Sequence, residues 1–595
     1  MTALQDLWTT IAEGDKRDFM VLPRQRVSYA DLREMTGQWL SWFSAAGIAP
    51  GDRLVIRTAD EVAAVTAFIA ALLDGVVPVL LTADTPDARL AGVVEAVEPA
   101  GVAADILPAG VDTRIAVLAL SPAPAPARPS WFSRDRRANT LAFLPQSDSR
   151  RVPHLPGDDA GLAYLLFTSG TTAAPTGVQI TRANLLANLA TQTRLFGYDG
   201  KARIFNDMIL AHADGMIQGP IQALYCGGTV IRAGGFDLAR IEQWLNRVRA
   251  ERASHVITVP TVWAMIDRYA AHDDYFDAPE CRLLLSCAAH LPEDLWRRLE
   301  ARFARPVCNQ YGLTETVVTA LWAGPHPEMG KVGTLGKVAD GEARVADADA
   351  AGTGELQLRG DNVFPGYWRD PARTAASFTA DGWFKTGDLA RRLADGSFAY
   401  MGRSKTVIMA GGFLIRPEEI DEAMLRHPAV AESVTIGIED DLFGEVPVTA
   451  VVLAHGAAAA DENALAAHAR ACLEAQKVPK RIVMVPAIAR GPSGKPVLAD
   501  LRRLLTATVV GDPLPANHRD ITAEVTALAA DVFRVPAEAL ALTSGRGSVA
   551  GWDSFSQLNF VFAVEHHFGL SIPAARVATI ETIADMVRTV RDLSA

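Results

Sequence analysis

Short apolar runs alternate with helix-like patterns through most of the first 400 residues, and this alternation restricts the fold more than any other feature. Four of the runs cover residues 53–57, 76–81, 162–167 and 255–259. Gly, Pro or Asp lies close to at least one end of each run, which is typical of buried strands. The longest run, 62–73, stops at Asp74 and is expected to form a buried helix. Strands that alternate with helices predict an α/β protein with layered sheets.

The length of 595 residues exceeds what one hydrophobic core supports and indicates about three or four domains. Hairpin signals, including the turn dipeptide Asp395-Gly396, complete a large first part that we place at 1–403. The segment 404–508 has its own helix and strand signals and is expected to be a small α+β part. A proline-containing linker follows at 509–518, and the helical remainder, 519–595, has the size of a separate bundle.

The charge and the cysteine content exclude several classes of protein. A formal net charge of -12 argues against a general nucleic-acid binder, because no strongly basic face is available to neutralise phosphates. The five cysteines are odd in number and form no CxxC pair, which predicts a reducing compartment and no disulfide or metal framework. No secretory signal is visible, and no apolar run is long enough to span a bilayer. We therefore expect a soluble, cytoplasmic protein without nucleic-acid or membrane partners.

A hydroxyl-rich turn follows the predicted strand 162–167. Its residues are Thr168, Ser169, Gly170, Thr171 and Thr172. Such a turn offers backbone N–H groups and four hydroxyl donors to anionic oxygens. A Ser/Thr-rich turn is more often only a turn, so this motif alone is weak evidence for phosphate binding.

A second motif is the run Tyr311-Gly312-Leu313-Thr314-Glu315, preceded by Asn309. An aromatic face can stack on a purine, an amide can bind its exocyclic amine, and a carboxylate can hold Mg²⁺ on a triphosphate. The ordinary alternative is a strand end with an exposed acid.

Three later motifs are individually modest. Asp388 ends the run 382–388, where a short acid after a tight turn either accepts two hydrogen bonds from a ribose or forms an Asx-type turn. Arg403 and Lys405 lie at the predicted boundary between the first two parts, where a charged surface loop is the ordinary alternative. Lys495 follows Gly494, and a single lysine on such a loop is more often plain surface than catalytic.

In their order and spacing, these five motifs resemble those of the adenylate-forming superfamily. This superfamily includes acyl-CoA synthetases, luciferases and the adenylation domains of nonribosomal peptide synthetases. The resemblance covers residues 1 to about 505. It implies that 1–403 is the large N-terminal part of an adenylation domain and that 404–508 is its small mobile part. The implied reaction uses ATP and Mg²⁺ to convert a carboxylic acid into an acyl-adenylate, with release of pyrophosphate.

The resemblance also implies a role for each motif. The turn 168–172 binds the ATP phosphates. The other nucleotide positions are Asn309 and Tyr311 for adenine, Thr314 for a phosphate, Glu315 for Mg²⁺, and Asp388 and Arg403 for the ribose.

Three further positions belong to the moving parts of such an enzyme. Lys495 bridges the substrate carboxylate and the α-phosphate, which lowers the repulsion between two anions and aligns the attack. Lys405 marks the hinge about which the small part turns. Gly411 and Gly412 line the tunnel through which the thiol arrives.

A last motif, Gly551-Trp552-Asp553-Ser554-Phe555, begins a predicted helix. Serine is a favoured helix N-cap, so a capped helix is the ordinary alternative. The run nevertheless resembles the attachment site of acyl and peptidyl carrier proteins, which are four-helix domains of the length of 519–595. By that resemblance, a phosphopantetheinyl transferase attaches 4′-phosphopantetheine to Ser554, and the phosphodiester lies at a helix N-terminus.

Two positions depart from the family pattern. Relatives have Gly-x-Pro-Lys-Gly after the phosphate turn, but this chain has Thr176 in place of the lysine. The lost charge is worth about 1–3 kcal/mol as a charge-assisted hydrogen bond, so weaker ATP binding is expected. Relatives often have a glycine pair where this chain has Cys287 and Ala288. The added side-chain atoms narrow the acyl pocket and favour a short acyl group.

The substrate class rests on the run His212-Ala213-Asp214-Gly215. It resembles the HxxG run of acyl and aryl acid synthetases, in which His212 either contacts the substrate or packs beside it. Asp214 lies near the position where amino-acid-activating relatives carry an acid, so an amino substrate stays open.

We therefore expect a loading module of secondary metabolism that adenylates a small carboxylic acid and transfers the acyl group to the arm on Ser554. No condensation or thioesterase domain fits in the remaining length, so downstream enzymes act in trans. Three alternatives remain. They are an acyl-CoA synthetase that uses free CoA, an amino-acid-activating adenylation–carrier didomain, and a catalytically degenerate scaffold.

Overall fold

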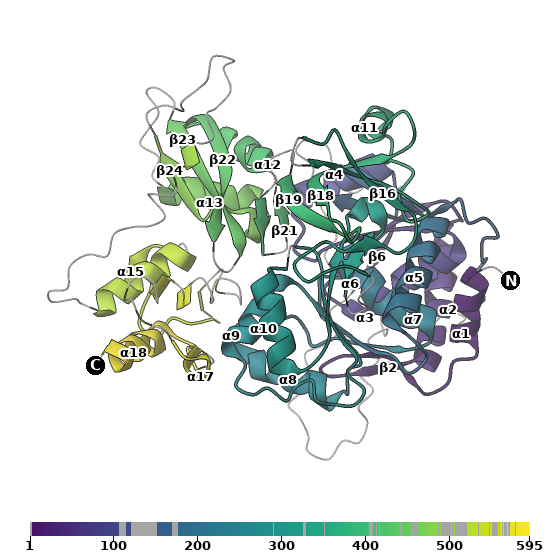
Figure 1. Cartoon of the computed structure of the whole chain (residues 1–595), viewed down its shortest axis with the longest axis horizontal. Helices are drawn as coiled ribbons and strands as arrows, with labels where there is room; N and C mark the ends of the chain where they lie inside the picture. The colour runs from purple at the N-terminus through teal and green to yellow at the C-terminus, as the bar shows by residue number, and fades with distance from the viewer. Residues whose placement is uncertain are drawn as a thin grey trace. The chain divides into compact units, whose positions relative to one another are not determined.

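The computed structural model describes most of the chain in two compact units. The described residues are 3–105, 115–120, 151–168, 176–289, 291–324, 329–349, 352–403, 408–411, 413–415, 417–440, 443–453, 462–485, 488, 501–502, 505, 521–533, 535–546, 548–549, 552, 557, 560–561, 563–564, 568, 570, 572–577 and 579–594. Unit 1 comprises Met1–Gly235, Ala250–Val259 and Asp277–Lys405, and unit 2 comprises Phe236–Arg249, Pro260–Phe276 and Thr406–Ala595. Figure 1 shows the elements of both units.

The largest sheet of unit 1, sheet A, has nine strands in the order β15-β14-β13-β12-β11-β9-β10-β1-β2. The strands from β13 to β1 are parallel, whereas β2, β14 and β15 are antiparallel to their neighbours. Their bounds are β1 Asp18–Val21, β2 Arg26–Ser28, β9 Arg203–Asn206, β10 Thr229–Ile231, β11 His255–Thr258, β12 Leu283–Ser286, β13 Val307–Tyr311, β14 Leu321–Ala323 and β15 Lys337–Val338. The parallel order places the carboxyl ends of β11, β12 and β13 along one edge.

Sheet B has six strands in the order β6-β5-β3-β4-β7-β8, all parallel except β8. Its strands are β3 Arg53–Arg57, β4 Val77–Leu81, β5 Gly101–Ala104, β6 Ala116–Ala119, β7 Leu162–Thr168 and β8 Thr176–Thr181. The strands β3, β4 and β7, together with β11 of sheet A, confirm the four strands predicted from apolar runs. Their ends agree with the predicted bounds to within one residue. The parallel strands and the helices between them confirm the α/β class.

Unit 1 also contains helices and short helical turns. They are α1 Ala3–Ala12, α2 Tyr29–Ala46, α3 Glu61–Asp74, α4 Asp87–Val97, α5 Arg182–Phe196, α6 Ala213–Met216, the π-helical turn η1 Ile217–Ile221, α7 Gln222–Cys226, α10 Glu293–Phe303, the 3₁₀ turn η3 Thr314–Thr316 and α11 Pro371–Ser377. The helix α2 contacts α1 and α3, and α7 contacts α1 and α5 (Figure 1).

The predicted buried helix is α3, and its sequence explains its limits. Asp60 caps the helix, since its carboxylate accepts hydrogen bonds from the backbone N–H groups of Val62 and Ala63. Gly75 ends the helix in the left-handed conformation, with φ of 79°. Every residue from Val62 to Leu73 is buried, so the helix lies inside the core on all sides.

Sheet C completes unit 1 with four antiparallel strands in the order β16-β17-β18-β19. They are β16 Glu342–Ala346, β17 Thr353–Arg359, β18 Phe384–Arg392 and β19 Phe398–Arg403. The predicted hairpin turn lies between β18 and β19, where Gly396 has φ of 86° and the Asp395 carboxylate accepts the backbone N–H of Ser397.

Unit 2 contains sheet D, in the order β21-β20-β23-β22 with β24 paired to β23. Its elements are η2 Leu238–Arg240, α8 Ile241–Ala250, α9 Pro260–Tyr269, β20 Ile408–Ala410, β21 Phe413–Ile415, α12 Pro417–Leu425, β22 Val430–Asp440, β23 Gly444–Leu453, α13 Glu462–Cys472, η5 Ala475–Lys477, β24 Arg481–Met484, α15 Ile521–Phe533, η6 Ala537–Ala539, α17 Ala574–Val577 and α18 Ile583–Ser594. The helices α12 and α13 contact β22 and β24 respectively (Figure 1). The described residues after 520 form mainly helices, as predicted for the carrier segment.

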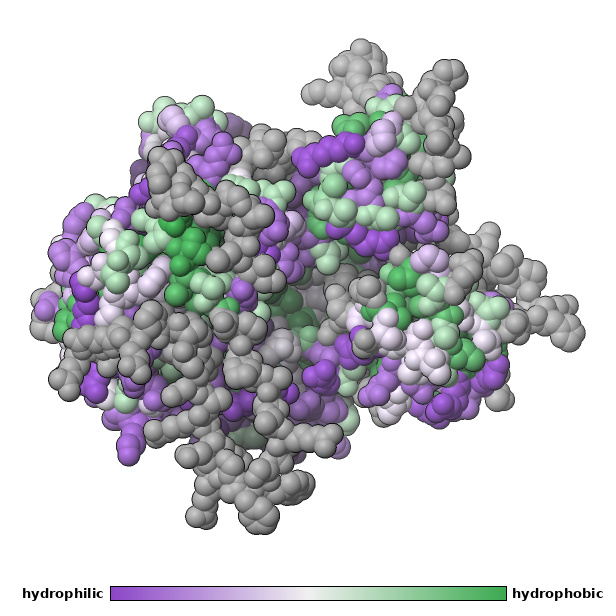
Figure 2. Space-filling model, turned by 180° about the vertical axis from the view of Figure 1, so that it is seen from behind, coloured by the Kyte–Doolittle hydropathy of each residue, from purple (hydrophilic) through white to green (hydrophobic). Residues whose placement is uncertain are grey.

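The surface carries hydrophobic side chains in separate places. Among the described residues, large exposed apolar side chains occur in both units, and they include Val152, Ile209, Leu425 and Leu542. Figure 2 shows this for one face, where hydrophilic and hydrophobic residues are mixed. Within the described residues, no helix combines the length and the apolar character needed to cross a bilayer.

Candidate active site

The first contact of the site joins sheets A and C. Tyr311 is the last residue of β13, and its hydroxyl donates a hydrogen bond of 2.6 Å to Oδ2 of Asp388 on β18. Asp388 is only 1 % exposed and is paired with Arg403 in the register of β18 and β19. The predicted adenine-binding and ribose-binding residues therefore lie side by side, although they are 77 positions apart in the sequence.

Asn309 and Gly312 fix the local shape around Tyr311. Asn309 is buried, and its Nδ2 donates to the carbonyl of Thr334 at 3.1 Å, while its Oδ1 has no partner among the described residues. A side chain at Gly312 has no room, because its Cβ would lie 1.7 Å from the carbonyl oxygen of Val318. Close backbone approach is thus the reason for this glycine.

Glu315 lies in η3, directly after Thr314, and is held from a distant segment. Its Oε1 accepts a hydrogen bond of 2.8 Å from the hydroxyl of Tyr367, and its backbone carbonyl accepts the N–H of Phe364 at 2.8 Å. Burial and the charge of Glu315 raise the pKa of Tyr367 well above its usual range, so the phenol stays a donor. Val317, which follows η3, has φ of 67°, a strained conformation for a β-branched residue.

The chemistry of these groups suits a magnesium nucleotide. Mg²⁺ that is shared with phosphates needs only one or two protein carboxylates, and Glu315 supplies one in a fixed orientation. A phenol donor orients the carboxylate without cancelling its charge. Glu315 is therefore the residue in this site that fits the ion.

The predicted acyl-pocket residues also gather in unit 1. His212 is the exposed N-cap residue of α6, and Asp214 lies in the first turn of that helix. The carboxylate Oδ1 of Asp214 accepts a hydrogen bond of 2.8 Å from Nε2 of Gln218, one turn later. Burial raises the pKa of Asp214 to about 6, and the thiol of Cys287 also hydrogen-bonds to it. Two of the four predicted pocket residues, Asp214 and Cys287, thus form one polar group with Gln218.

Cys287 and Ala288 have distinct positions at the end of β12. The Cys287 sulfur lies 3.6 Å from the sulfur of Met208, and burial raises the pKa of the thiol well above its usual range. Ala288 has φ of 66°, in the left-handed region that favours glycine. The glycine of the family pattern would adopt this conformation without strain, and the methyl group of Ala288 adds bulk at that point.

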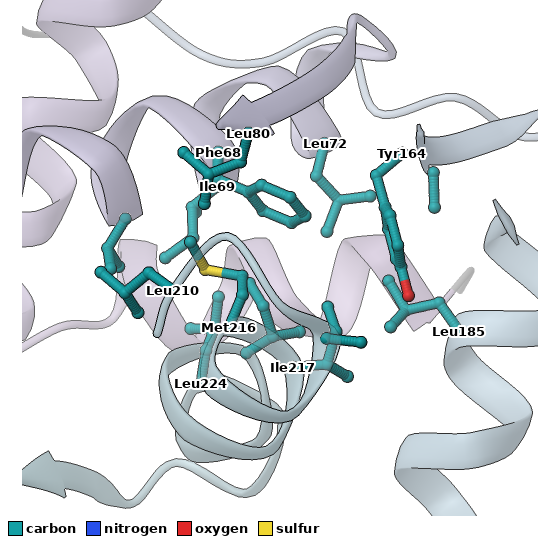
Figure 3. Close-up of a cluster of buried hydrophobic side chains, with 14 of the residues drawn as sticks. Phe68, Ile69, Leu72, Leu80, Tyr164, Leu185, Leu210, Met216, Ile217 and Leu224 are labelled. Atoms are coloured by element: carbon teal, nitrogen blue, oxygen red, sulfur yellow. The ribbon is translucent and has the colours of Figure 1, made fainter. Parts of the chain in front are cut away.

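A rigid hydrophobic core supports the helical stretch that carries Asp214. Figure 3 shows Met216, Ile217 and Leu224, from the α6–η1–α7 stretch, facing Phe68 and Leu72 of α3. All five side chains are at most 2 % exposed. Because this core is close-packed, the position of Asp214 is determined by the fold rather than by a loose loop.

Several predicted residues lie outside what the structure describes. These are Ser169, Gly170, Thr171, Thr172, Lys405, Gly412, Lys495 and Ser554, together with the side chains of Thr168 and Arg403. The backbone of Thr168 pairs with Thr176 where β7 and β8 meet. In unit 2, Gly411 follows β20 with φ of 58°, and its N–H donates to the carbonyl of Phe443.

The fold and the nucleotide-suited site of unit 1 define an adenylate-forming ligase. The chain belongs to the AMP-binding enzyme family, whose family model matches residues 7–368. The model of the AMP-binding enzyme C-terminal domain matches 419–495, and that of the phosphopantetheine attachment site matches 523–590. The first match implies ATP as the activating substrate, and the third implies a phosphopantetheine arm.

Several curated relatives are named as CoA ligases. The chain is 36% identical to the sulfoacetate–CoA ligase of Cupriavidus necator over 60% of its own length and 70% of that protein. It is 31% identical to the oxalate–CoA ligase of Arabidopsis thaliana over 56% of its own length and 65% of that protein.

Solved structures give the same family. A malonyl-CoA ligase in complex with methylmalonyl-CoA and AMP has a TM-score of 0.65 and 29% identity, and the match covers 80% of this chain and 97% of that one. The amide bond synthetase McbA of Marinactinospora thermotolerans has a TM-score of 0.72 at 23% identity, over 85% and 99% of the two chains, and shows the fold alone.

Sequence reasoning missed two residues of this site. Tyr367, which holds Glu315, is 52 positions away from it, and no local spacing links the two. Gln218 is four positions after Asp214 on a helical stretch, so the i, i+4 spacing is the sequence signal that links the two side chains.

Proposed function

We propose that the chain activates a short carboxylic acid as an acyl-adenylate and transfers the acyl group to the phosphopantetheine arm on Ser554. The observation that supports this best is that the attachment-site match follows both adenylate-forming matches in one chain. The arm then delivers a thiol at high effective concentration to the enzyme that makes its substrate. A phosphopantetheinyl transferase and downstream enzymes acting in trans are the partners that this role requires, and a biosynthetic loading module in the cytoplasm is its natural setting.

In the first half-reaction, a carboxylate oxygen of the acid attacks the α-phosphorus of ATP, and pyrophosphate leaves. Tyr311 and Asn309 hold the adenine, Asp388 and Arg403 the ribose, and Glu315 the Mg²⁺ that neutralises the phosphates. Thr314 and the turn 168–172 bind phosphate oxygens, as they do in the family pattern.

The catalytic cation of the first half-reaction is Lys495. It shields the two anions that meet in the first step and leaves when the small part turns about Lys405. In the second half-reaction, a thiol sulfur that has lost its proton attacks the acyl carbon, and AMP leaves. The thiol arrives past Gly411 and Gly412.

The polar group formed by Asp214, Gln218 and Cys287 restricts the class of substrate. Its carboxylate has Gln218 and Cys287 as partners among the described residues, and neither carries a positive charge. A second anionic group on the substrate would be repelled there, whereas a hydroxyl or ammonium group would donate to it. We therefore propose a short acid with a hydrogen-bond donor, in contrast to the sulfoacetate and oxalate of the relatives' names. His212, on the exposed side of the same turn, contacts this acid or its carboxylate.

Intact-protein mass spectrometry tests the proposal. The chain is first treated with a phosphopantetheinyl transferase and CoA, and then with ATP and one acid at a time: acetate, 3-hydroxypropionate, β-alanine, malonate and sulfoacetate. We expect a first mass increase from the arm and a second from the acyl group, with the hydroxy or amino acid preferred. Ser554→Ala removes both increases, and Lys495→Ala removes the second only. An arm that never gains an acyl group from any acid contradicts carrier loading.

Several relatives favour a second candidate, because they are named as CoA ligases. In that case free CoA takes the acyl group, and the carrier segment serves another purpose. The Ser554→Ala variant separates the two candidates. Formation of free acyl-CoA at an undiminished rate by this variant supports the CoA ligase, and loss of all thioester product supports carrier loading. If no acid supports ATP–pyrophosphate exchange, the degenerate scaffold is the remaining interpretation.

A further inference from the structure

Thr176 occupies the position where the family pattern has a lysine, and the structure places it at a defined point. It opens β8 and pairs with Thr168, the last residue of β7, where the two strands enclose the predicted phosphate turn. The side chain is 6 % exposed. A lysine at this point would direct its charge to the phosphates, but a threonine hydroxyl has none.

A guanidinium group from another part of unit 1 reaches this hydroxyl. Nη1 of Arg373, on α11, donates a hydrogen bond of 2.9 Å to Oγ1 of Thr176. The backbone of Arg373 is fixed in turn, because its N–H donates to the capping carboxylate of Asp370 at 2.9 Å. The two residues are 197 positions apart, so only the fold brings them together.

The guanidinium of Arg373 rests on neutral partners. Besides the Thr176 hydroxyl, it lies over the ring of Tyr367, with Cζ 4.6 Å from the ring centroid. Within the described part of the chain, no carboxylate forms an ion pair with it. Arg369, four positions earlier, is different, since it pairs with the carboxylate of Glu98 at 2.6 Å. Arginine has five N–H donors, so Arg373 keeps donors and a full charge for an anion.

The same tyrosine connects this cation to the predicted magnesium ligand. The ring of Tyr367 lies under Arg373, and its hydroxyl donates to Oε1 of Glu315 at 2.8 Å. Segment 366–368 is in turn paired with β8, through the Trp368 N–H that donates to the Gly177 carbonyl at 2.7 Å. The ring of Tyr367 therefore lies between the carboxylate of Glu315, which is suited to Mg²⁺, and the guanidinium of Arg373, which is suited to phosphate. A magnesium triphosphate requires this arrangement of one negative and one positive group.

We infer that Arg373 binds the β- and γ-phosphates of ATP and replaces the lysine that position 176 lacks, with Thr176 as the group that orients it. The positive charge of the family's lysine at position 176 then comes from Arg373, so the substitution to Thr176 does not abolish ATP binding. Arg373 acts in ground-state binding of ATP and in holding the pyrophosphate that leaves, whereas it makes no contact that AMP needs.

Isothermal titration calorimetry on the full chain, with Mg²⁺ and without any acid, tests this inference. Arg373→Gln is expected to raise the Kd of ATP by about 10- to 100-fold, the worth of one charge-assisted hydrogen bond to phosphate. The Kd of AMP, which has neither a β- nor a γ-phosphate, should change less than about twofold. Unchanged AMP binding also shows that the variant is folded. Adding Thr176→Lys to Arg373→Gln is expected to recover ATP affinity, because the charge returns to its family position.

Arg369→Gln is the matched control, because it removes the same charge from the same segment and should leave both constants unchanged. Equal weakening of ATP and AMP by Arg373→Gln would mean a structural role and would overturn the inference. Unchanged ATP affinity in Arg373→Gln, with normal affinity in the wild-type chain, overturns it as well and leaves the proposed function intact. A wild-type chain that does not bind ATP would overturn both.

Discussion

The hydrogen bond between Tyr311 and Asp388 allows a quantitative test of how the site is assembled. Tyr311→Phe keeps the ring but removes the donor to a carboxylate that is 1 % exposed. A hydrogen bond to a charged group is worth about 1.5–3 kcal/mol, and a buried acceptor that loses its donor costs a similar amount. Asp388→Asn keeps an acceptor but removes the charge, so it should cost about half as much. If the two groups act as a pair, the double variant should show a coupling free energy of about 1–2 kcal/mol.

Urea unfolding of the nucleotide-free chain, followed by tryptophan fluorescence, gives these free energies. Trp322 reports on the relevant region, because it is fully buried on β14 and is paired with Gln310, beside Tyr311. Tyr29→Phe is the control, since its hydroxyl donates at 2.7 Å to the neutral carbonyl of Gly228, and its effect should add to that of Asp388→Asn. Additive effects of Tyr311→Phe and Asp388→Asn would refute the reasoning, because the short contact would then carry no energy of its own.

Three further predictions concern single positions. Lowering the pH from 7 to 5 should cost about 2 kcal/mol of stability, because burial lowers the pKa of His255 to about 4 and only the unfolded chain then takes up a proton. This stability is fully present above about pH 6.5 and is lost as the pH falls. Urea titrations of His255→Gln should not show this loss of about 2 kcal/mol between pH 7 and pH 5. Gly312→Ala should destabilise by about 2–4 kcal/mol in the same assay, because the new Cβ meets the Val318 carbonyl, whereas Gly197→Ala, in open space, should cost only about 1 kcal/mol. Ala288→Gly should raise stability by up to about 1 kcal/mol, seen as a higher midpoint of thermal unfolding, because φ of 66° is strained for alanine; a lower midpoint would contradict this.

The parts of the fold that the sequence predicted well are those with strong local signals. The helix α3 was recognisable because eleven of the twelve residues from Val62 to Leu73 are apolar and the run stops at Asp74. The strands β3 and β7 were recognisable because each is a short apolar run with turn residues nearby. In each case the information lies within a window of about 15 residues, where periodicity and capping act directly.

The site was predictable as a set of residue types but not as a set of contacts. The motif around Tyr311 and Glu315 carries a visible signal, since an aromatic, a glycine and an acid stand together. The groups that orient these residues, Asp388 and Tyr367, come from 77 and 52 positions away. Spacing along a chain does not encode which strand ends meet at a sheet edge, so these pairs follow only from the arrangement of sheets A and C.

The two site carboxylates share one physical arrangement, and it bears on how this enzyme binds ATP. Glu315 and Asp388 each accept a hydrogen bond from a tyrosine hydroxyl, at 2.8 and 2.6 Å. A phenol fixes the direction of a carboxylate and leaves its negative charge in place, so the charge is available to a metal ion or to ribose hydroxyls. The positive charge that the phosphates need is separate from these carboxylates, and in our inference the guanidinium of Arg373 supplies it. That is why a chain can lose the lysine at position 176 and still retain the binding of a magnesium triphosphate, provided that a guanidinium such as that of Arg373 lies beside the same hydroxyl.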